Sequence, residues 1–145
     1  MEQRVNLQQT HPHVYKAMLG LSASLGNANL TPVQKELIKI RASQINSCAF
    51  CINMHTADAL KAGETVQRIF LLNAWRETDL FTEEEKALLA LTEEVTMISA
   101  HGVSENTYHQ AERFFSKETI GDIITAAVVI NAWNRIAVST QLQIS

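Results

Sequence analysis

The sequence predicts an all-α fold, a bundle of about six or seven helices that forms a single domain over residues 1–145. Three observations support this prediction. Helix-capping motifs recur along the chain, no segment alternates polar and apolar residues for the length of a strand, and no Asn-Gly or Asp-Gly hairpin motif occurs. A chain of 145 residues fits one domain with a sizeable core, and no repeat or linker divides it.

Capping residues place the helices of the first half. The segment Thr31–Gln34 combines an N-cap, a proline at the first helical position and a capping-box glutamine, so a helix begins there. This helix is expected to end at Asn46–Ser47, which in turn is expected to cap a second helix from Cys48 to about Gly63. Another helix is expected upstream, over about residues 12–24.

Four more helices are expected in the second half, because capping motifs and a glycine divide it into helical segments. Their expected positions are residues 64–77, residues 82–99, a segment that restarts at Ser104 after a break at His101–Gly102, and residues 116–141.

Two of these helices are apolar on more than one side. The stretch Ile123–Ile130 leaves no polar face, and the helix that begins at Cys48 carries apolar residues on opposite sides. A domain of this size rarely encloses two helices completely. We therefore expect the chains to associate into a homo-oligomer that covers the excess apolar surface.

Composition excludes several classes of partner. The net charge is −3 and the Lys and Arg residues are scattered, so we expect no nucleic-acid partner. The N-terminus lacks the apolar core of a signal peptide, and the longest apolar run, Ile123–Ala132, is far shorter than the ~20 residues that cross a bilayer. We expect a cytoplasmic protein with no membrane partner. In that compartment, two cysteines three residues apart indicate catalysis or metal binding.

The segment Cys48–His55 carries the strongest chemical signal. On a helix, Cys48, Cys51 and His55 fall within an arc of roughly 60°. A spacing of three residues brings two cysteines within the Cα separation of about 4.4–6.8 Å that a disulfide needs. The helix N-terminus favours the thiolate, and His55 can exchange a proton with Cys51 directly or through a water molecule. The segment therefore predicts a dithiol/disulfide couple with an acid/base group.

Other interpretations of this segment remain open. The cysteines could serve packing alone. A zinc site could use Cys48, Cys51 and His55 with Glu36 as a fourth ligand, although structural zinc usually recruits a second Cys/His pair, which this chain lacks. Haem attachment is excluded because Ile52 follows the second cysteine where histidine is required, and the missing strands exclude a thioredoxin fold.

With Glu36 added, the spacing Glu-x11-Cys-x2-Cys-x3-His resembles that of the AhpD-like alkylhydroperoxidase family, part of the carboxymuconolactone decarboxylase superfamily. On its own, Glu36 would be expected to be solvated in the second turn of a helix. The core of the resemblance spans residues 36–63. Weaker support comes from three further segments, Trp75–Glu77, Phe81–Glu85 and Asn131–Arg135.

The resemblance implies an AhpD-like helical fold, assembly into a dimer, trimer or hexamer, and reduction of a hydroperoxide without metal, haem or flavin. Cys51 would be the peroxidatic cysteine, and Cys48 would resolve it and meet the reductant. His55 and Glu36 would form the proton relay. The reductant would be a dithiol protein, either lipoyl-bearing or of the thioredoxin type.

The sequence departs from the best-known members of this family at Phe50. Those members have a histidine between the two cysteines, so this chain lacks one acid/base or hydrogen-bond partner. Two alternatives to a peroxidase therefore stay open, a general thiol–disulfide oxidoreductase and a redox sensor. Both would use the same pair of cysteines.

Overall fold

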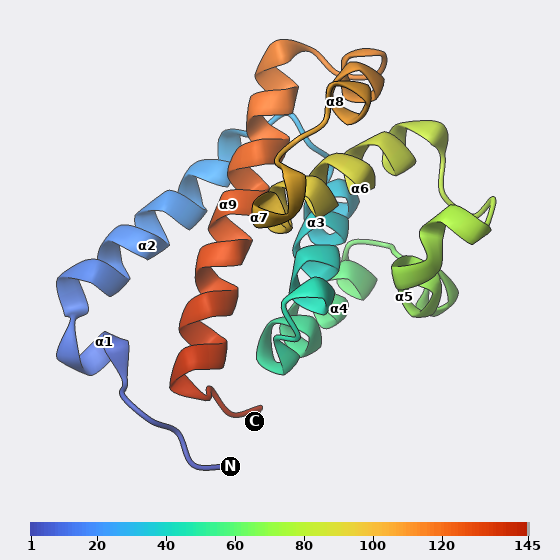
Figure 1. The fold of residues 1–145 in the computed structure, drawn as a ribbon. Coiled ribbons are helices and arrows are strands. Elements are labelled where there is room, and N and C mark those ends of the chain that lie inside the picture. The colour runs from blue at the N-terminus through green and yellow to red at the C-terminus, as the bar shows by residue number, and fades with distance from the viewer. Residues whose placement is uncertain (145) are drawn as a thin grey trace.

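The computed structural model describes residues 1–144 and is an all-α single domain (Figure 1). The elements of this part of the chain are, in order, α1 (Leu7–Thr10), α2 (Pro12–Ser24), η1 (Leu25–Asn27), α3 (Pro32–Ile45), α4 (Ala49–Lys61), α5 (Val66–Leu71), η2 (Leu72–Glu77), α6 (Glu83–Thr96), α7 (Ile98–His101), α8 (Glu105–Glu112) and α9 (Lys117–Thr140), where η marks a 3-10 helix. The prediction of an all-α fold is confirmed.

The predicted number of six or seven helices is too low, since the described chain has nine α-helices. The additional ones, α1 and α7, are single turns of four residues, too short to leave a periodic apolar pattern. The helix predicted over residues 64–77 is divided into α5 and η2, with non-helical backbone at Ala74. The helix predicted to reach Ser99 ends at Thr96.

Capping motifs place the helix starts where the sequence predicts them. The hydroxyls of Thr31 and Thr82 each accept a hydrogen bond from the backbone N–H three residues on, and the side chains of Gln34 and Glu85 accept one from the amide of the cap residue. These reciprocal bonds satisfy N–H groups that a helix N-terminus otherwise leaves unpaired. Ser116 caps α9 through the amide of Thr119.

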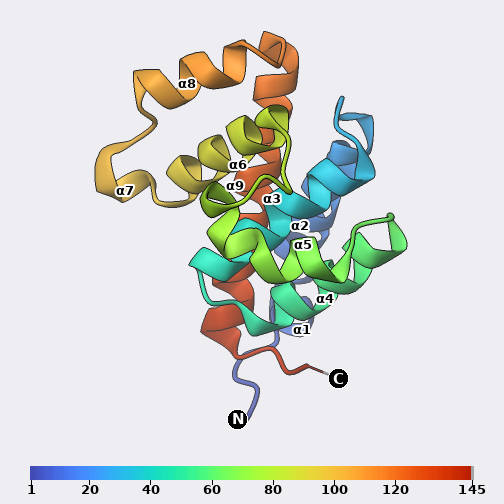
Figure 2. The same cartoon turned by 90° about the vertical axis from the view of Figure 1, so that its right-hand side faces the viewer.

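The core lies where α3, α6 and α9 meet (Figure 1, Figure 2). Leu37 and Ile40 of α3, Leu88 of α6 and Ile123 of α9 are fully buried there. Removing each such side chain from water contributes about 1.5–3 kcal/mol. The two ends of the chain lie close together at the end of the molecule opposite α8, and the Arg4 amide donates a hydrogen bond of 2.9 Å to the carbonyl of Thr140.

The two helices with apolar residues on more than one side differ in burial. α9 buries ten residues, although Val128 and Val138 on its outer side are exposed. α4 buries only Cys51 and Ala59, so a single chain does not enclose this helix, as expected for a domain of this size.

By length and composition alone, α9 could cross a membrane, and it is the single helix of the described chain that passes this test. The buried core helix of a soluble protein passes the same test. In this structure 44% of the apolar window is buried, and the buried residues include Ala127 and Ile130.

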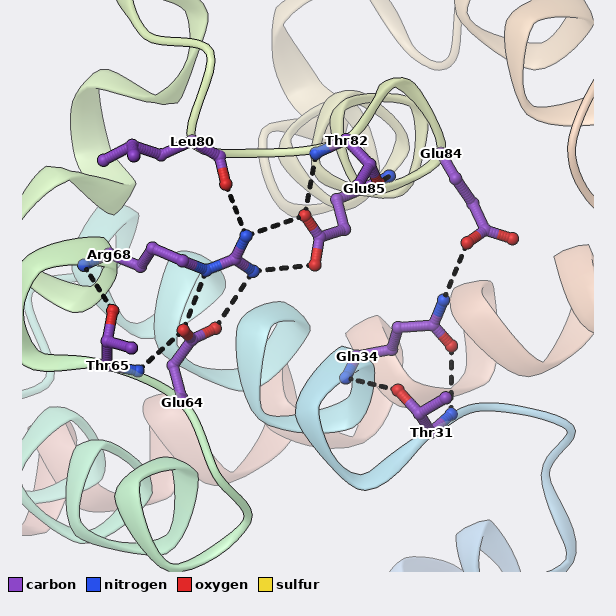
Figure 3. Close-up of polar contacts among 9 residues, drawn as sticks. All are labelled: Thr31, Gln34, Glu64, Thr65, Arg68, Leu80, Thr82, Glu84 and Glu85. Carbon is purple, nitrogen blue, oxygen red and sulfur yellow. Dashed lines mark hydrogen bonds and ion pairs between the residues drawn. The ribbon is translucent and has the colours of Figure 1, made fainter.

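An arginine between two carboxylates joins α5 to the start of α6 (Figure 3). Arg68 donates paired hydrogen bonds to Glu64 and to Glu85, one more to the carbonyl of Leu80, and its guanidinium stacks on Phe81 at 4.5 Å. Bonds to Glu85, ahead of those to Glu64, raise the pKa of Arg68 above its usual value even though burial opposes this. The cluster fixes the connection that follows α4.

A second buried carboxylate, Glu93 of α6, holds three partners. Its oxygens accept hydrogen bonds from Arg41 at 2.8 Å, Trp75 Nε1 at 2.9 Å and Arg76 at 2.6 Å. Burial alone would raise the pKa of Glu93, but the bonds from Arg41, Arg76 and Trp75 outweigh it and lower the pKa. Arg76 therefore pairs with Glu93 on another helix. It does not pair with Glu77, the acidic residue beside it in the sequence.

Glu93 should make stability depend on pH below about 4.5. Its folded pKa lies below the ordinary 4.5, so the unfolded chain binds more protons between the two values. The stabilisation is therefore complete above about pH 4.5 and is lost as the pH falls through the folded pKa. Glu93→Gln should lower the urea unfolding free energy at pH 7 by about 3 kcal/mol and flatten its decline in acid.

The exposed Glu77→Gln is the matched control, and it should leave both the free energy and its pH dependence unchanged. An unaltered acid decline in Glu93→Gln would contradict the assignment.

Candidate functional site

A tight turn places the two cysteines against α3. α3 ends at Ile45, and Ser47 adopts left-handed backbone angles, with φ 54°, which are uncommon for a residue other than glycine. The Cys48 amide then donates a hydrogen bond of 2.9 Å to the carbonyl of Ser43. This turn reverses the chain so that α4 packs along α3 (Figure 2).

Two amides of α9, the buried Asn134 and the half-buried Asn131, hold this turn. The Asn46 side chain donates to Asn131 at 2.9 Å and to Asn134 at 3.0 Å, and Asn134 donates to the Ser43 hydroxyl at 2.9 Å. Asn131 also donates to Thr96 at 3.0 Å. The sequence offers no reason to assign a role to Asn131 or Asn134, although two amides within a largely apolar helical stretch were the available signal.

The two cysteines form a disulfide, with Cα atoms 5.4 Å apart, as their spacing predicts. Asn46 and Ser47 do not cap α4, which corrects the prediction. Cys48 itself is the N-cap, and its sulfur accepts a hydrogen bond of 3.3 Å from the Cys51 amide. Cys48 is 1% exposed and Cys51 2% exposed. A backbone donor aimed at the Cys48 sulfur favours negative charge on it once the bond is reduced.

The fold brings Glu36 of α3 to His55 of α4. His55 Nδ1 lies 3.0 Å from Glu36 Oε2, and Lys39 Nζ lies 2.8 Å from Glu36 Oε1. Glu36 is 9% exposed, so the solvated position expected from its place in the helix is wrong. Burial alone would raise the pKa of Glu36, but the hydrogen bonds from His55 and Lys39 outweigh it and lower the pKa below 4.5.

The ionised Glu36 determines which nitrogen of His55 carries the proton. A carboxylate can only accept hydrogen bonds, so Nδ1 of His55 must donate. In the neutral imidazole, Nε2 is then unprotonated and free to accept a proton. Glu36 would also stabilise the imidazolium that results. The pair therefore has the arrangement of a general base held by an orienting carboxylate.

A cavity of about 730 Å³ opens beside this pair. Cys51 and His55 both line it, whereas Cys48 does not. Phe50 and Trp133 add aromatic surface, and α2, α3, α4, α9 and the N-terminal residues all contribute to the walls. Apolar cavities of this size with a few polar groups are typical of ligand sites. The structure thus gives the two sulfurs different surroundings.

Two of these side chains, together with Asp58 of α4, could approach a metal ion. Ligand atoms of Glu36, His55 and Asp58 lie within 4.8 Å of one another. Lys39 already occupies one oxygen of Glu36, and its positive charge opposes a cation there. In the disulfide form neither sulfur is a thiolate, so the zinc site considered from the sequence does not form in this state.

Comparison with known proteins identifies the family. The model of the carboxymuconolactone decarboxylase family matches residues 12–94, which is more than half of the chain. The chain belongs to this family. The uncharacterised protein YdfG of Bacillus subtilis is 42% identical to it over 139 residues, which cover 96% of this chain and 95% of YdfG.

Solved structures place the chain in the AhpD-like part of the family. A protein of unknown function from Agrobacterium tumefaciens, named as a candidate antioxidant defence protein AhpD, matches with a TM-score of 0.96 and 37% identity over 99% of both chains. The debrominase Bmp8 matches with a TM-score of 0.85 and 19% identity, over 95% of this chain and 74% of Bmp8. The likeness to Bmp8 shows the fold alone.

The Glu36–His55 pair should govern how fast reduced Cys51 reacts. In a Cys48→Ser background, His55→Gln should slow alkylation of Cys51 by iodoacetamide at pH 7 about tenfold or more, because the acceptor for its proton is lost. Glu36→Gln should give a smaller decrease, since His55 loses the carboxylate that orients it. The measurement is the alkylation rate followed by mass spectrometry.

His109→Gln, which alters an exposed histidine of α8, is the control and should leave the rate unchanged. Equal rates in all four proteins would show that the pair does not activate the thiol.

Proposed function

We propose that this protein is a cofactor-independent thiol peroxidase that reduces organic hydroperoxides. The observation that carries the proposal is the placement of Cys51 and His55 on one apolar cavity, with Cys48 bonded to Cys51 behind it. Such a site offers a nucleophile, a base and a resolving thiol around a space for a substrate. Glu36 is the positioning residue for the base.

The reaction balances without a metal or flavin. His55 takes the proton of Cys51, and the thiolate attacks the terminal oxygen of the hydroperoxide, which breaks the O–O bond. Cys51 becomes a sulfenic acid, and the alkoxide leaves as an alcohol with the proton from His55. The Cys48 thiol then displaces water from the sulfenic acid and closes the disulfide. A dithiol donor reduces this bond through a mixed disulfide and is itself oxidised.

The donor in this proposal is a dithiol carried on a protein, either lipoyl-bearing or of the thioredoxin type. Both sulfurs are almost completely buried, and the cavity reaches Cys51 alone. A slender lipoyl arm can enter such a cavity more readily than a folded protein surface can. In this proposal the arm attacks the Cys51 sulfur, whereas the family resemblance implies attack at Cys48. Reducing dithiols of either kind belong to the cytoplasm, which is the compartment that we propose.

Phe50 favours a second candidate, a thiol–disulfide oxidoreductase or redox sensor that lacks efficient peroxide turnover. Phe50 lies between the two cysteines in the sequence. Its half-buried ring lines the cavity and cannot donate or accept a proton. The AhpD-like fold also accommodates other substrates, since a variant of the debrominase Bmp8 has been solved in complex with 2,3,4-tribromopyrrole. Disulfide formation without turnover would support this candidate.

We also infer that the protein is a homo-oligomer. α4 and α5 lie on the side of the molecule that faces the viewer in Figure 2, and these two helices expose several large apolar side chains. Phe70 is 76% exposed, and Leu60, Val66 and Leu71 are also exposed. Exposed apolar surface of this kind marks contact sites between proteins.

Peroxide turnover should separate the two cysteines. With excess dithiothreitol, Cys51→Ser should lose consumption of tert-butyl hydroperoxide by a factor of about 10³ or more, because the attacking thiolate is gone. Reduced Cys48→Ser that has been freed of dithiothreitol should consume about one equivalent per chain and accumulate a sulfenic acid, because no second cysteine resolves it internally.

Unchanged turnover in Cys51→Ser would overturn the proposal. If the wild type forms its disulfide but consumes no peroxide catalytically, the second candidate is favoured, and Phe50→His should then restore turnover.

Light scattering should give the mass of at least two chains, where one chain has a mass of 16.2 kDa. Phe70→Arg should shift the protein toward the monomer, because a charge then replaces an apolar contact. Phe114→Arg, an exposed position near the start of α9, is the control. A wild-type mass of one chain would contradict the inference.

A further inference from the structure

The cavity beside Cys51 is long. One of its walls is α9, whose lining residues begin at Ala126 and end at Thr140. At 1.5 Å per helical residue, this wall is about 21 Å long. α2 meets this wall at Trp133, where the Tyr15 ring packs edge-on against the indole and Ser22 accepts a hydrogen bond from it at 2.7 Å. The cavity is therefore a groove that follows α9, and an extended molecule would fit it.

Hydrogen bonds show which residues face each part of the groove. Just before α3, the Asn29 amide bonds to Asp122, near the start of α9, and within α3 Ser43 bonds to Asn134. α3 therefore follows α9 in the same direction, and Lys35 of α3 lies near the Ala126 end.

The reactive sulfur lies farther along the groove. Cys51 packs in a cluster with Ile130 and Ala137. These two residues are four and eleven positions beyond Ala126, which corresponds to roughly 6 and 16 Å along the helix. The thiol thus faces the middle of the groove, at a distance from the end where Lys35 lies.

The Lys35 end carries uncompensated positive charge. Within residues 1–144, no carboxylate lies within ion-pairing distance of Lys35, whereas Lys39 is paired with Glu36. His55 forms the other contact of Glu36. Of the charged groups that face this end, Lys35 is thus the one available to an anion. The remaining walls there are mainly apolar, and Leu25 and Val129 are among them.

We propose that the groove binds long-chain carboxylic acids, with the carboxylate at Lys35 and the alkyl chain along α9. If the proposed function holds, on which this step rests, the substrates are acids with a hydroperoxide in the middle of the chain. A short hydroperoxide that reaches Cys51 would leave Lys35 without an anionic partner. Each methylene that the groove takes from water raises the affinity about fourfold.

Binding can be tested without any peroxide. Oleic acid and its methyl ester are titrated into the oxidised protein below the concentration at which they aggregate, and tryptophan fluorescence reports on Trp133 in the groove. The acid should bind about two- to fivefold more tightly than the ester, as a partly exposed ion pair provides. Lys35→Gln should abolish this preference, and Lys117→Gln, an exposed position outside the groove, should retain it.

Equal affinity for acid and ester in the wild type, a preference retained in Lys35→Gln, or no binding of either ligand would overturn the proposal. Turnover of linoleic acid 13-hydroperoxide, its methyl ester and tert-butyl hydroperoxide then separates the two proposals. Acid-selective binding with no turnover of any hydroperoxide would refute the peroxidase and leave the ligand class standing. Turnover of tert-butyl hydroperoxide without a preference for the acid would refute the ligand class alone.

Discussion

The site depends on the hydrogen bonds that Asn46 makes with two amides of α9. These bonds hold the turn at Ser47, and the turn places α4 along α3. Both the N-cap position of Cys48 and the contact between His55 and Glu36 follow from that packing. Removing one partner would leave a buried polar group unpaired, which costs about 1–3 kcal/mol. The same amides thus contribute to stability and to the geometry of the dithiol.

Buried carboxylates in this protein stay ionised by the same physical means. Burial raises the pKa of Glu36, Glu85 and Glu93. Hydrogen bonds from cationic and other donors lower the pKa of each by more than burial raises it. At Glu93 the partners join three elements and serve stability. At Glu36 one partner is a histidine on a cavity, so the same arrangement provides a base.

The two sulfurs differ in their surroundings although they lie one helical turn apart. Cys48 sits in the cap, where a backbone N–H bonds to its sulfur, and Cys51 faces the groove. A substrate in the groove therefore meets Cys51 first. This asymmetry supports the assignment of Cys51 as the attacking residue on grounds independent of the family resemblance.

Local sequence patterns predict the helical class, the helix starts at Thr31, Thr82 and Ser116, and the dithiol/disulfide pair of Cys48 and Cys51. All of these depend on residues at most four positions apart, whose contacts follow from helix geometry. The burial of Glu36, the bonds of Asn46 to α9 and the kink at Ala74 depend on tertiary packing. Such features join residues that are distant in the chain or override local propensity, so no local pattern encodes them. The groove belongs to this second group, because its walls come from both ends of the chain.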